Sequence, residues 1–358
     1  MFRVCLVTLF FATLAAPAIA AGIKVAVVAP VDGPFALLGQ QILDGARFKA
    51  EERGSEIIAV PESCDTKDSD ALAKAVLASG AEAAIGFLCT ESLEAVLPTL
   101  VQTGIPGISL SVRSGILMED ALKQKWPFFR FAPSADMEVR AVTDIILSRW
   151  KNEPIALIED GTIHGRELVE GVRAALADVG MTPVFSDTYR PAQQQQISLV
   201  RRLAKSGATH VFIGGDRSDI AIIARDAASE NLPLTLMGGD VLNAADQPVP
   251  LADGVLAVAV PDYAASPQAR AVTGEMRAAD LMPEGYVLPA FSAVELLEQA
   301  KDQAGKNDSP LSAALLKGPY QTAIGPVRFD AGHELGDNPY RLLVWRNGRF
   351  VPAPAQPE

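Results

Sequence analysis

The sequence has few cysteines, few histidines and little positive charge. Its 358 residues include three Cys and three His, and 31 Lys and Arg stand against 43 Asp and Glu, for a net charge of −12. Nucleic acids and anionic membranes repel such a protein, which argues against both as partners. No histidine has a neighbour at metal-ligand spacing, and the motifs G-x-S-x-G and H-E-x-x-H are missing. We therefore expect a protein that is not an enzyme, with no catalytic residue, metal site or cofactor.

Long apolar runs are also missing, except at the amino terminus. Residues 1–20 contain one Arg near the start, an apolar run from Val4 to about Ala15, and the small residues of Ala18-Ile19-Ala20. This layout is typical of a secretory signal peptide. The run is shorter than the roughly 20 apolar residues that span a bilayer, which argues against a membrane anchor. We expect cleavage near Ala20 and a mature protein free in the periplasm or outside the cell.

Export changes the interpretation of the cysteines. Cys5 lies in the signal peptide, so the exported chain keeps only Cys64 and Cys89. Two thiols in an oxidising compartment tend to pair, and we predict a Cys64–Cys89 disulfide. Two buried free thiols are the alternative. A zinc site is disfavoured, because no histidine stands nearby to complete the ligands.

Short β-rich runs alternate with helical stretches along the mature chain. Ile23–Ala29 precedes a helical pattern at Phe35–Arg53, and Ile155–Glu159 precedes another at Gly165–Asp178. Repeated strand–helix–strand units predict an α/β fold of parallel sheets with helices on both faces. The rhythm breaks near residues 131–134, so we expect two doubly wound lobes. A final hairpin is predicted to turn at Asn347-Gly348.

Strand-to-helix turns are the usual ligand sites of such folds. At one turn, Thr90 and nearby backbone N–H groups are placed to hold a carboxylate against a positive helix end, or Thr90 simply caps the helix. At another, Asp240 follows Gly238-Gly239 and is a candidate partner for a cation, or an ordinary turn aspartate. We expect the two glycines to let the ligand approach the backbone closely. His164 lies in a further turn and is a candidate to line a cleft.

Taken in order, these segments resemble the leucine-isoleucine-valine-binding group of type I periplasmic binding proteins, which serve ABC importers. The resemblance covers essentially the whole mature chain, from VAVVAPVDGPFALLGQQILDGA through IGFLCTES, GIPGISLSVRS and LMGGD to IGPVRFDAGHE. It implies two lobes that close over a small molecule. They are joined by a hinge of three crossing strands near residues 131–134, 260–262 and 336–340. Lobe 1 is then residues 21–131 plus 262–337, and lobe 2 is residues 132–261 plus 338–358.

The resemblance also implies which residues meet the ligand. Thr90, Ser111 and neighbouring backbone groups would hold its carboxylate, and Asp240 would pair with its ammonium. Several of these positions differ from the family pattern, because aromatic or small hydroxyl side chains are usual where this chain has Leu38, Arg113, His164 and Asp216. The charges of Arg113 and Asp216 favour a ligand more polar than leucine. The full predicted set is Leu38, Thr90, Ser111, Val112, Arg113, His164, Asp216 and Asp240.

These observations predict an exported, monomeric solute-binding protein. It would capture a small amino acid-like ligand between its lobes and deliver it to the membrane permease of an ABC importer. An exported sensor that signals to a membrane receptor is the alternative, and a hydrolase is disfavoured because no nucleophile and base are evident. The sequence leaves open whether the ligand is a branched-chain amino acid, a more polar one, an amide or another small carboxylate.

Overall fold

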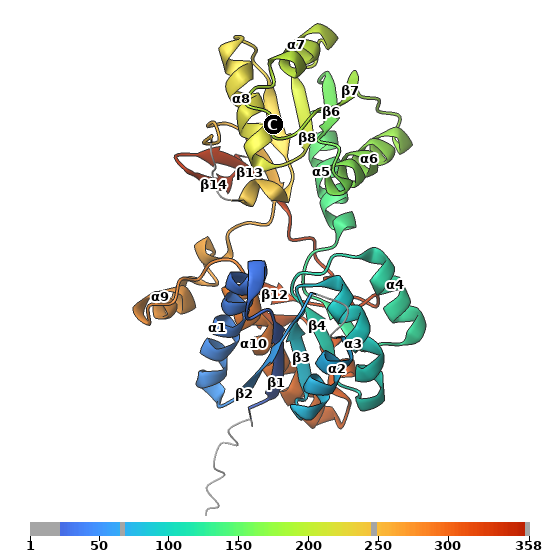
Figure 1. Cartoon of the computed structure of the whole chain (residues 1–358), viewed down its shortest axis with the longest axis vertical. Helices are drawn as coiled ribbons and strands as arrows, with labels where there is room; N and C mark the ends of the chain where they lie inside the picture. Colours follow the sequence, from blue (N-terminus) through green and yellow to red (C-terminus); the bar gives the residue numbers. More distant parts are fainter. Residues whose placement is uncertain (1–21, 65–68, 245–248, 355–358) are drawn as a thin grey trace, which may run out of the picture.

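A computed structural model describes residues 22–64, 69–244 and 249–354. The predicted signal peptide lies outside these residues. The chain forms two lobes, each built on its own β-sheet (Figure 1). We call the part around the five-stranded sheet lobe 1 and the part around the seven-stranded sheet lobe 2.

The sheet of lobe 1 is entirely parallel, with the strand order β2-β1-β3-β4-β5. Its strands are β1 (Lys24–Ala29), β2 (Glu56–Pro61), β3 (Ala83–Gly86), β4 (Gly107–Ser109) and β5 (Phe128–Arg130). The inner strands are mostly apolar because helices cover both faces of the sheet. One face carries α1 (Ala36–Arg53) and α10 (Val287–Asn307), and the other carries α2 (Ser69–Ala78), α3 (Thr90–Thr103) and α4 (Gly115–Gln124).

The sheet of lobe 2 is mixed, with the order β14-β13-β10-β9-β8-β6-β7. Its parallel strands are β6 (Ile155–Glu159), β7 (Phe185–Thr188), β8 (His210–Gly214), β9 (Thr235–Gly238) and β10 (Leu256–Ala259). The predicted hairpin, β13 (Arg341–Arg346) and β14 (Arg349–Pro352), adds an antiparallel edge. Four helices cover the two faces, namely α5 (Ala135–Arg149), α6 (Ile163–Asp178), α7 (Ile197–Ser206) and α8 (Arg217–Ser229).

The chain passes between the lobes at residues 131–134, 260–262 and 336–340, which we call the hinge segments (Figure 1). After the second passage it returns to lobe 1, where it forms η4 (Tyr263–Ala265), α9 (Arg270–Ala278), α10, α11 (Leu311–Leu315), β11 (Tyr320–Thr322) and β12 (Gly325–Val327). The predicted fold class is therefore confirmed. Sequence reasoning did not find α4, β5 or the β11–β12 hairpin.

The predicted disulfide is confirmed. Cys64 and Cys89 are bonded, with their Cα atoms 5.5 Å apart. The bond ties the chain after β2 to the residue directly before α3. No helix in the described ranges is both long and apolar enough to cross a membrane.

Candidate ligand-binding site

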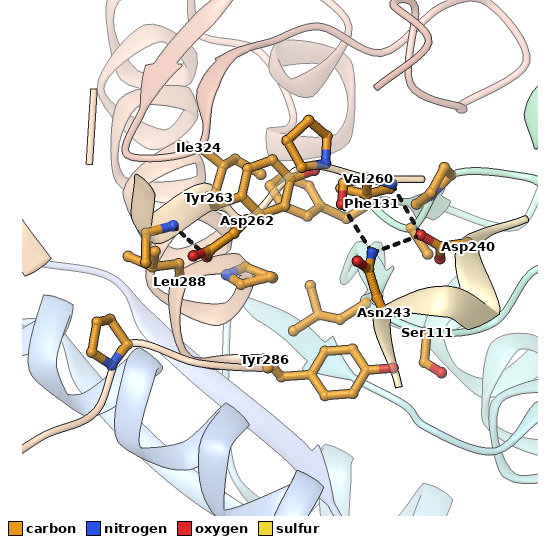
Figure 2. Close-up of a pocket in the computed structure, with 18 of the residues that line it drawn as sticks. Ser111, Phe131, Asp240, Asn243, Val260, Asp262, Tyr263, Tyr286, Leu288 and Ile324 are labelled. Carbon is orange, nitrogen blue, oxygen red and sulfur yellow. Dashed lines mark hydrogen bonds between the residues drawn. The ribbon is translucent and has the colours of Figure 1, made fainter. Parts of the chain in front are cut away.

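A cavity of about 540 Å³ lies between the lobes, next to the hinge segments (Figure 2). Lobe 1 contributes the loop after β4 and the turn before α10, and lobe 2 contributes the 3₁₀ helix η3 (Asp240–Asn243) that follows β9. Ligands of doubly wound folds bind beyond the carboxyl ends of the strands, which is where these loops lie. The volume is within the range of small-molecule sites.

Most of the cavity wall is apolar or aromatic. The larger of these lining side chains are Leu110, Phe131, Tyr263, Tyr286, Leu288 and Ile324 (Figure 2). Burial raises the pKa of the Tyr263 hydroxyl to about 12, so it stays a neutral hydrogen-bonding group. Apolar walls with a few polar groups are typical of ligand pockets, in which the polar groups set the orientation of the ligand.

Arg113 of lobe 1 forms an ion pair with lobe 2 in this cavity. Its guanidinium Nη2 donates to Asp240 Oδ2 at 2.8 Å, and its Nη1 lies 3.5 Å from Glu138 Oε2. The Arg113 side chain is 36% exposed, whereas that of Glu138 is 1% exposed. Burial raises the pKa of Glu138, although the Asp240 N–H and the Arg113 charge both oppose this shift. The predicted ligand residues Arg113 and Asp240 therefore contact each other.

Asp240 is held in place by several groups of lobe 2. Its Oδ1 accepts hydrogen bonds from the Val260 N–H at 3.0 Å and from Asn243 Nδ2 at 3.2 Å (Figure 2). Its own N–H donates to Glu138 Oε1 at 2.8 Å. A Cβ on Gly239 would lie 2.4 Å from that same oxygen. Gly239 therefore makes room for the Glu138 carboxylate.

The amino end of α3, predicted to bind the ligand carboxylate, holds a carboxylate of the protein itself. Glu62 accepts hydrogen bonds from the N–H groups of Leu88 at 2.9 Å and Cys89 at 3.1 Å, and from the Ser92 hydroxyl. Glu62 is buried. The helix begins at Thr90 with Cys89 at the N-cap position, so Thr90 is not the cap residue.

Three of the predicted site residues, Ser111, Arg113 and Asp240, line the cavity. The other five do not line it. Leu38 lies in α1 and Thr90 begins α3, and both residues are half-buried. Val112 is buried in lobe 1. His164, near the start of α6, and Asp216, directly before α8, are exposed.

Sequence reasoning missed several residues that shape the site, namely Glu138, Asn243, Phe131, Tyr263 and Tyr286. Two of them, Phe131 and Tyr263, lie in or directly beside hinge segments, and this is the only sequence signal. Among the described residues, no group of three or more His, Cys, Asp or Glu side chains is arranged to hold a metal ion.

Two α/β lobes with a cavity at their hinge define a two-lobed binding protein. Residues 22–349 match the model of the family described as periplasmic binding protein. The chain therefore belongs to this family, and the predicted resemblance is confirmed.

Individual relatives agree with this assignment. The chain is 24% identical to the Leu/Ile/Val-binding protein homolog 3 of Brucella melitensis biotype 1 over 360 residues, which cover 96% of each chain. It resembles the structure of a putative branched-chain amino acid ABC transporter from Rhodospirillum rubrum, with a TM-score of 0.80, 16% identity, and coverage of 93% of this chain and 100% of that one. It also resembles an ABC transporter solute-binding protein from R. palustris in complex with benzoate, with a TM-score of 0.67, 20% identity, and coverage of 92% and 95%.

Proposed function

We propose that this protein is an exported, monomeric solute-binding protein that captures a small amino acid-like ligand between its lobes and delivers it to the permease of an ABC importer. The observation that carries the proposal is the cavity at the hinge, in which Arg113 and Asp240 lie side by side. An amino acid has one group for each of these charges. The name of the Brucella relative, a Leu/Ile/Val-binding protein homolog, supports the same ligand class.

The charges in the cavity favour a zwitterion over a simple anion. Among the described residues, two acids, Asp240 and Asp262, line the cavity with one cation, Arg113, and Glu138 Oε2 lies 3.5 Å from Nη1 of that guanidinium. A zwitterionic ligand adds no net charge to these charged side chains, whereas a monoanionic ligand adds a further negative charge. A small aromatic carboxylate is the second candidate, because Phe131 and two tyrosines line the wall and the R. palustris structure contains benzoate.

The ligand would be enclosed by movement of the lobes about the hinge segments. Residues 21–131 with 262–337 would move as one body, and residues 132–261 with 338–358 as the other. The cavity lies beside these segments, so a small rotation there changes the distance between Ser111 of lobe 1 and Asp240 of lobe 2. Hinge closure around a ligand is a common way to exclude water from such a site.

A thermal-shift screen over the common amino acids, their amides and small carboxylates including benzoate tests the proposal. A ligand at 100 times its Kd adds about 2.7 kcal/mol to the free energy of unfolding, so a true ligand is expected to raise the Tm clearly. If no compound in the screen raises the Tm, the proposed function is wrong. Uptake of the identified ligand by cells with and without the protein then tests delivery to an importer.

A further inference from the structure

A second cavity, of about 370 Å³, lies on lobe 1 outside the cleft. It is formed by the carboxyl end of α4, the residues that lead into β5, helix α11 and His333. Trp126 and Pro127 directly precede β5, so this cavity lies at the amino end of that strand, whereas the cleft lies beyond the carboxyl ends. Its volume is within the range of small-molecule sites. We call it the lobe 1 cavity.

Most of the wall of the lobe 1 cavity is apolar. Leu122 and Leu316 lie on it and are 41% and 37% exposed. Exposed apolar side chains that gather around a concave surface are typical of a binding site. The apolar lining side chains are Ala121, Leu122, Trp126, Pro127, Ala313 and Leu316.

Three side-chain donors on this wall have no hydrogen-bond or ion-pair partner among the described residues. They are the ammonium of Lys125, the indole N–H of Trp126 and the hydroxyl of Ser312. No Asp or Glu is among the described residues that line the cavity, although the whole chain has a net charge of −12. A cation and neutral donors in an apolar wall suit a carboxylate, because a carboxylate accepts hydrogen bonds and carries the opposite charge.

His333 gives this cavity a wall that is fixed by the protein. Its Nδ1 donates to the Phe128 carbonyl oxygen at 2.9 Å, since a carbonyl oxygen can only accept. The ring stacks on Phe129, with the ring centroids 4.4 Å apart and the planes 8° from parallel. The His333 carbonyl accepts the N–H of Arg130 at 3.0 Å. A wall that is already in place costs a ligand little ordering of side chains.

We propose that the lobe 1 cavity binds a small organic monoanion with an apolar or aromatic body. The carboxylate of such a ligand accepts hydrogen bonds from Lys125 and from the indole of Trp126, and its body packs between Leu122 and Leu316. The volume suits a molecule of about ten non-hydrogen atoms and is too small for a folded segment of another protein. This inference goes beyond the proposed function, because the site lies outside the cleft.

Fluorescence titration with phenylacetate tests the proposal. Trp126 is half-buried and lines the cavity, whereas Trp150 and Trp345 are buried. A ligand of this size in a half-open cavity is expected to change the fluorescence with a Kd of about 1 mM. Phenylacetamide has the same body without the charge, and is expected to bind at least about threefold more weakly.

Two variants with matched controls locate the site. Ala313→Leu fills part of the cavity and is expected to weaken phenylacetate binding about tenfold or more, whereas Ala75→Leu, at an exposed position of α2, leaves it unchanged. Lys125→Gln is expected to remove the preference for the acid over the amide. Lys123→Gln removes the same charge two residues away, outside the cavity lining, and is expected to keep that preference.

The proposal is overturned if phenylacetate up to about 10 mM, ten times the expected Kd, gives no saturable change in fluorescence. A signal that persists in Ala313→Leu comes from another site, such as the cleft, and overturns it as well. Equal affinities for acid and amide, or a preference that Lys125→Gln keeps, exclude a charged anchor in this cavity. If Ala313→Leu does not fold, the comparison of acid and amide on the unchanged protein and on Lys125→Gln decides.

Discussion

At the scale of single residues, each lobe contains a buried carboxylate that holds backbone N–H groups in place. Glu62 holds the amino end of α3 in lobe 1, and Glu138 holds the backbone of Asp240 in lobe 2. Burial raises the pKa of both groups, although hydrogen bonds to each oppose the shift. Each buried carboxylate stabilises the backbone segment whose N–H groups donate hydrogen bonds to it. Burial disfavours the charged form of the carboxylate, so Glu62 and Glu138 hold these segments in place at a cost in free energy.

The raised pKa of Glu62 leads to a prediction about pH. Folded protein holds the Glu62 proton to a higher pH than unfolded protein, whose glutamate has a pKa near 4.5. As the pH rises above that value, the unfolded state loses its proton first, so the contribution of Glu62 to the free energy of unfolding falls. We expect the unchanged protein to lose stability relative to Glu62→Gln as the pH is raised from 4.5.

Urea unfolding of both proteins across this pH range measures the difference. The quantity compared is the free energy of unfolding of the unchanged protein minus that of the variant. The titration of all other groups is common to both proteins and cancels in this difference. A difference that is independent of pH, or that moves in favour of the unchanged protein as the pH rises, contradicts the prediction.

At the scale of elements, close backbone contact joins the two ends of lobe 1's sequence. Helix α1 comes from the start of the described chain and α10 from near its end, and they cover the same face of the sheet. A Cβ on Gly45 of α1 would lie 2.0 Å from the Val287 carbonyl oxygen of α10. Because backbone atoms cannot move aside as a flexible side chain can, this glycine sets the distance between the helices.

We predict that Gly45→Ala lowers the free energy of unfolding by about 1–3 kcal/mol, because the added methyl group overpacks this contact. The matched control is Gly274→Ala in α9, where a Cβ meets nothing within 4 Å. That change is expected to raise stability by up to about 1 kcal/mol through helix propensity. Thermal or urea unfolding of both variants is the measurement, and equal effects of the two changes would contradict the role of Gly45.

The disulfide gives a second prediction at this scale. It closes a segment of 25 residues between Cys64 and Cys89, and loop-closure entropy of this size corresponds to about 3 kcal/mol. We expect the double variant Cys64→Ala/Cys89→Ala to lose about that much stability in urea. A reducing agent should destabilise the unchanged protein to a similar extent and leave the double variant unaffected. Insensitivity of the unchanged protein to reduction would argue against a stabilising bond.

At the scale of the whole molecule, the lobes are connected by the three hinge segments and by the ion pair of Arg113 with Asp240. The ion pair joins residues 127 positions apart in the sequence. A ligand that binds both lobes would add contacts on each side of the cleft. Small-angle scattering is therefore expected to show a smaller radius of gyration when the ligand is bound at saturation. An unchanged radius would contradict closure about the hinge.

The sequence by itself determined the features that depend on neighbouring residues. The strand–helix rhythm predicted the α/β class, because the hydrophobic period is a local property of each segment. The turn at Asn347 and Gly348 was predictable for the same reason, since both residues adopt the positive φ that a tight hairpin needs. The disulfide was predictable because only two cysteines, Cys64 and Cys89, lie outside the predicted signal peptide.

Only the tertiary structure decided which charged groups meet. Asp240 was expected to bind a cationic group of the ligand, and the fold places it in an ion pair with Arg113 of the other lobe. Thr90 was expected at a carboxylate site, and the fold brings Glu62 to that helix end from the end of β2. Ion pairs and helix-end contacts between distant segments depend on how the helices and strands pack together. The hydrophobic periodicity of a segment and its short motifs do not predict that packing. Of the groups that line the cavity, the sequence thus indicated Ser111, Arg113 and Asp240, whereas the pairing of Arg113 with Asp240 was not readable from it.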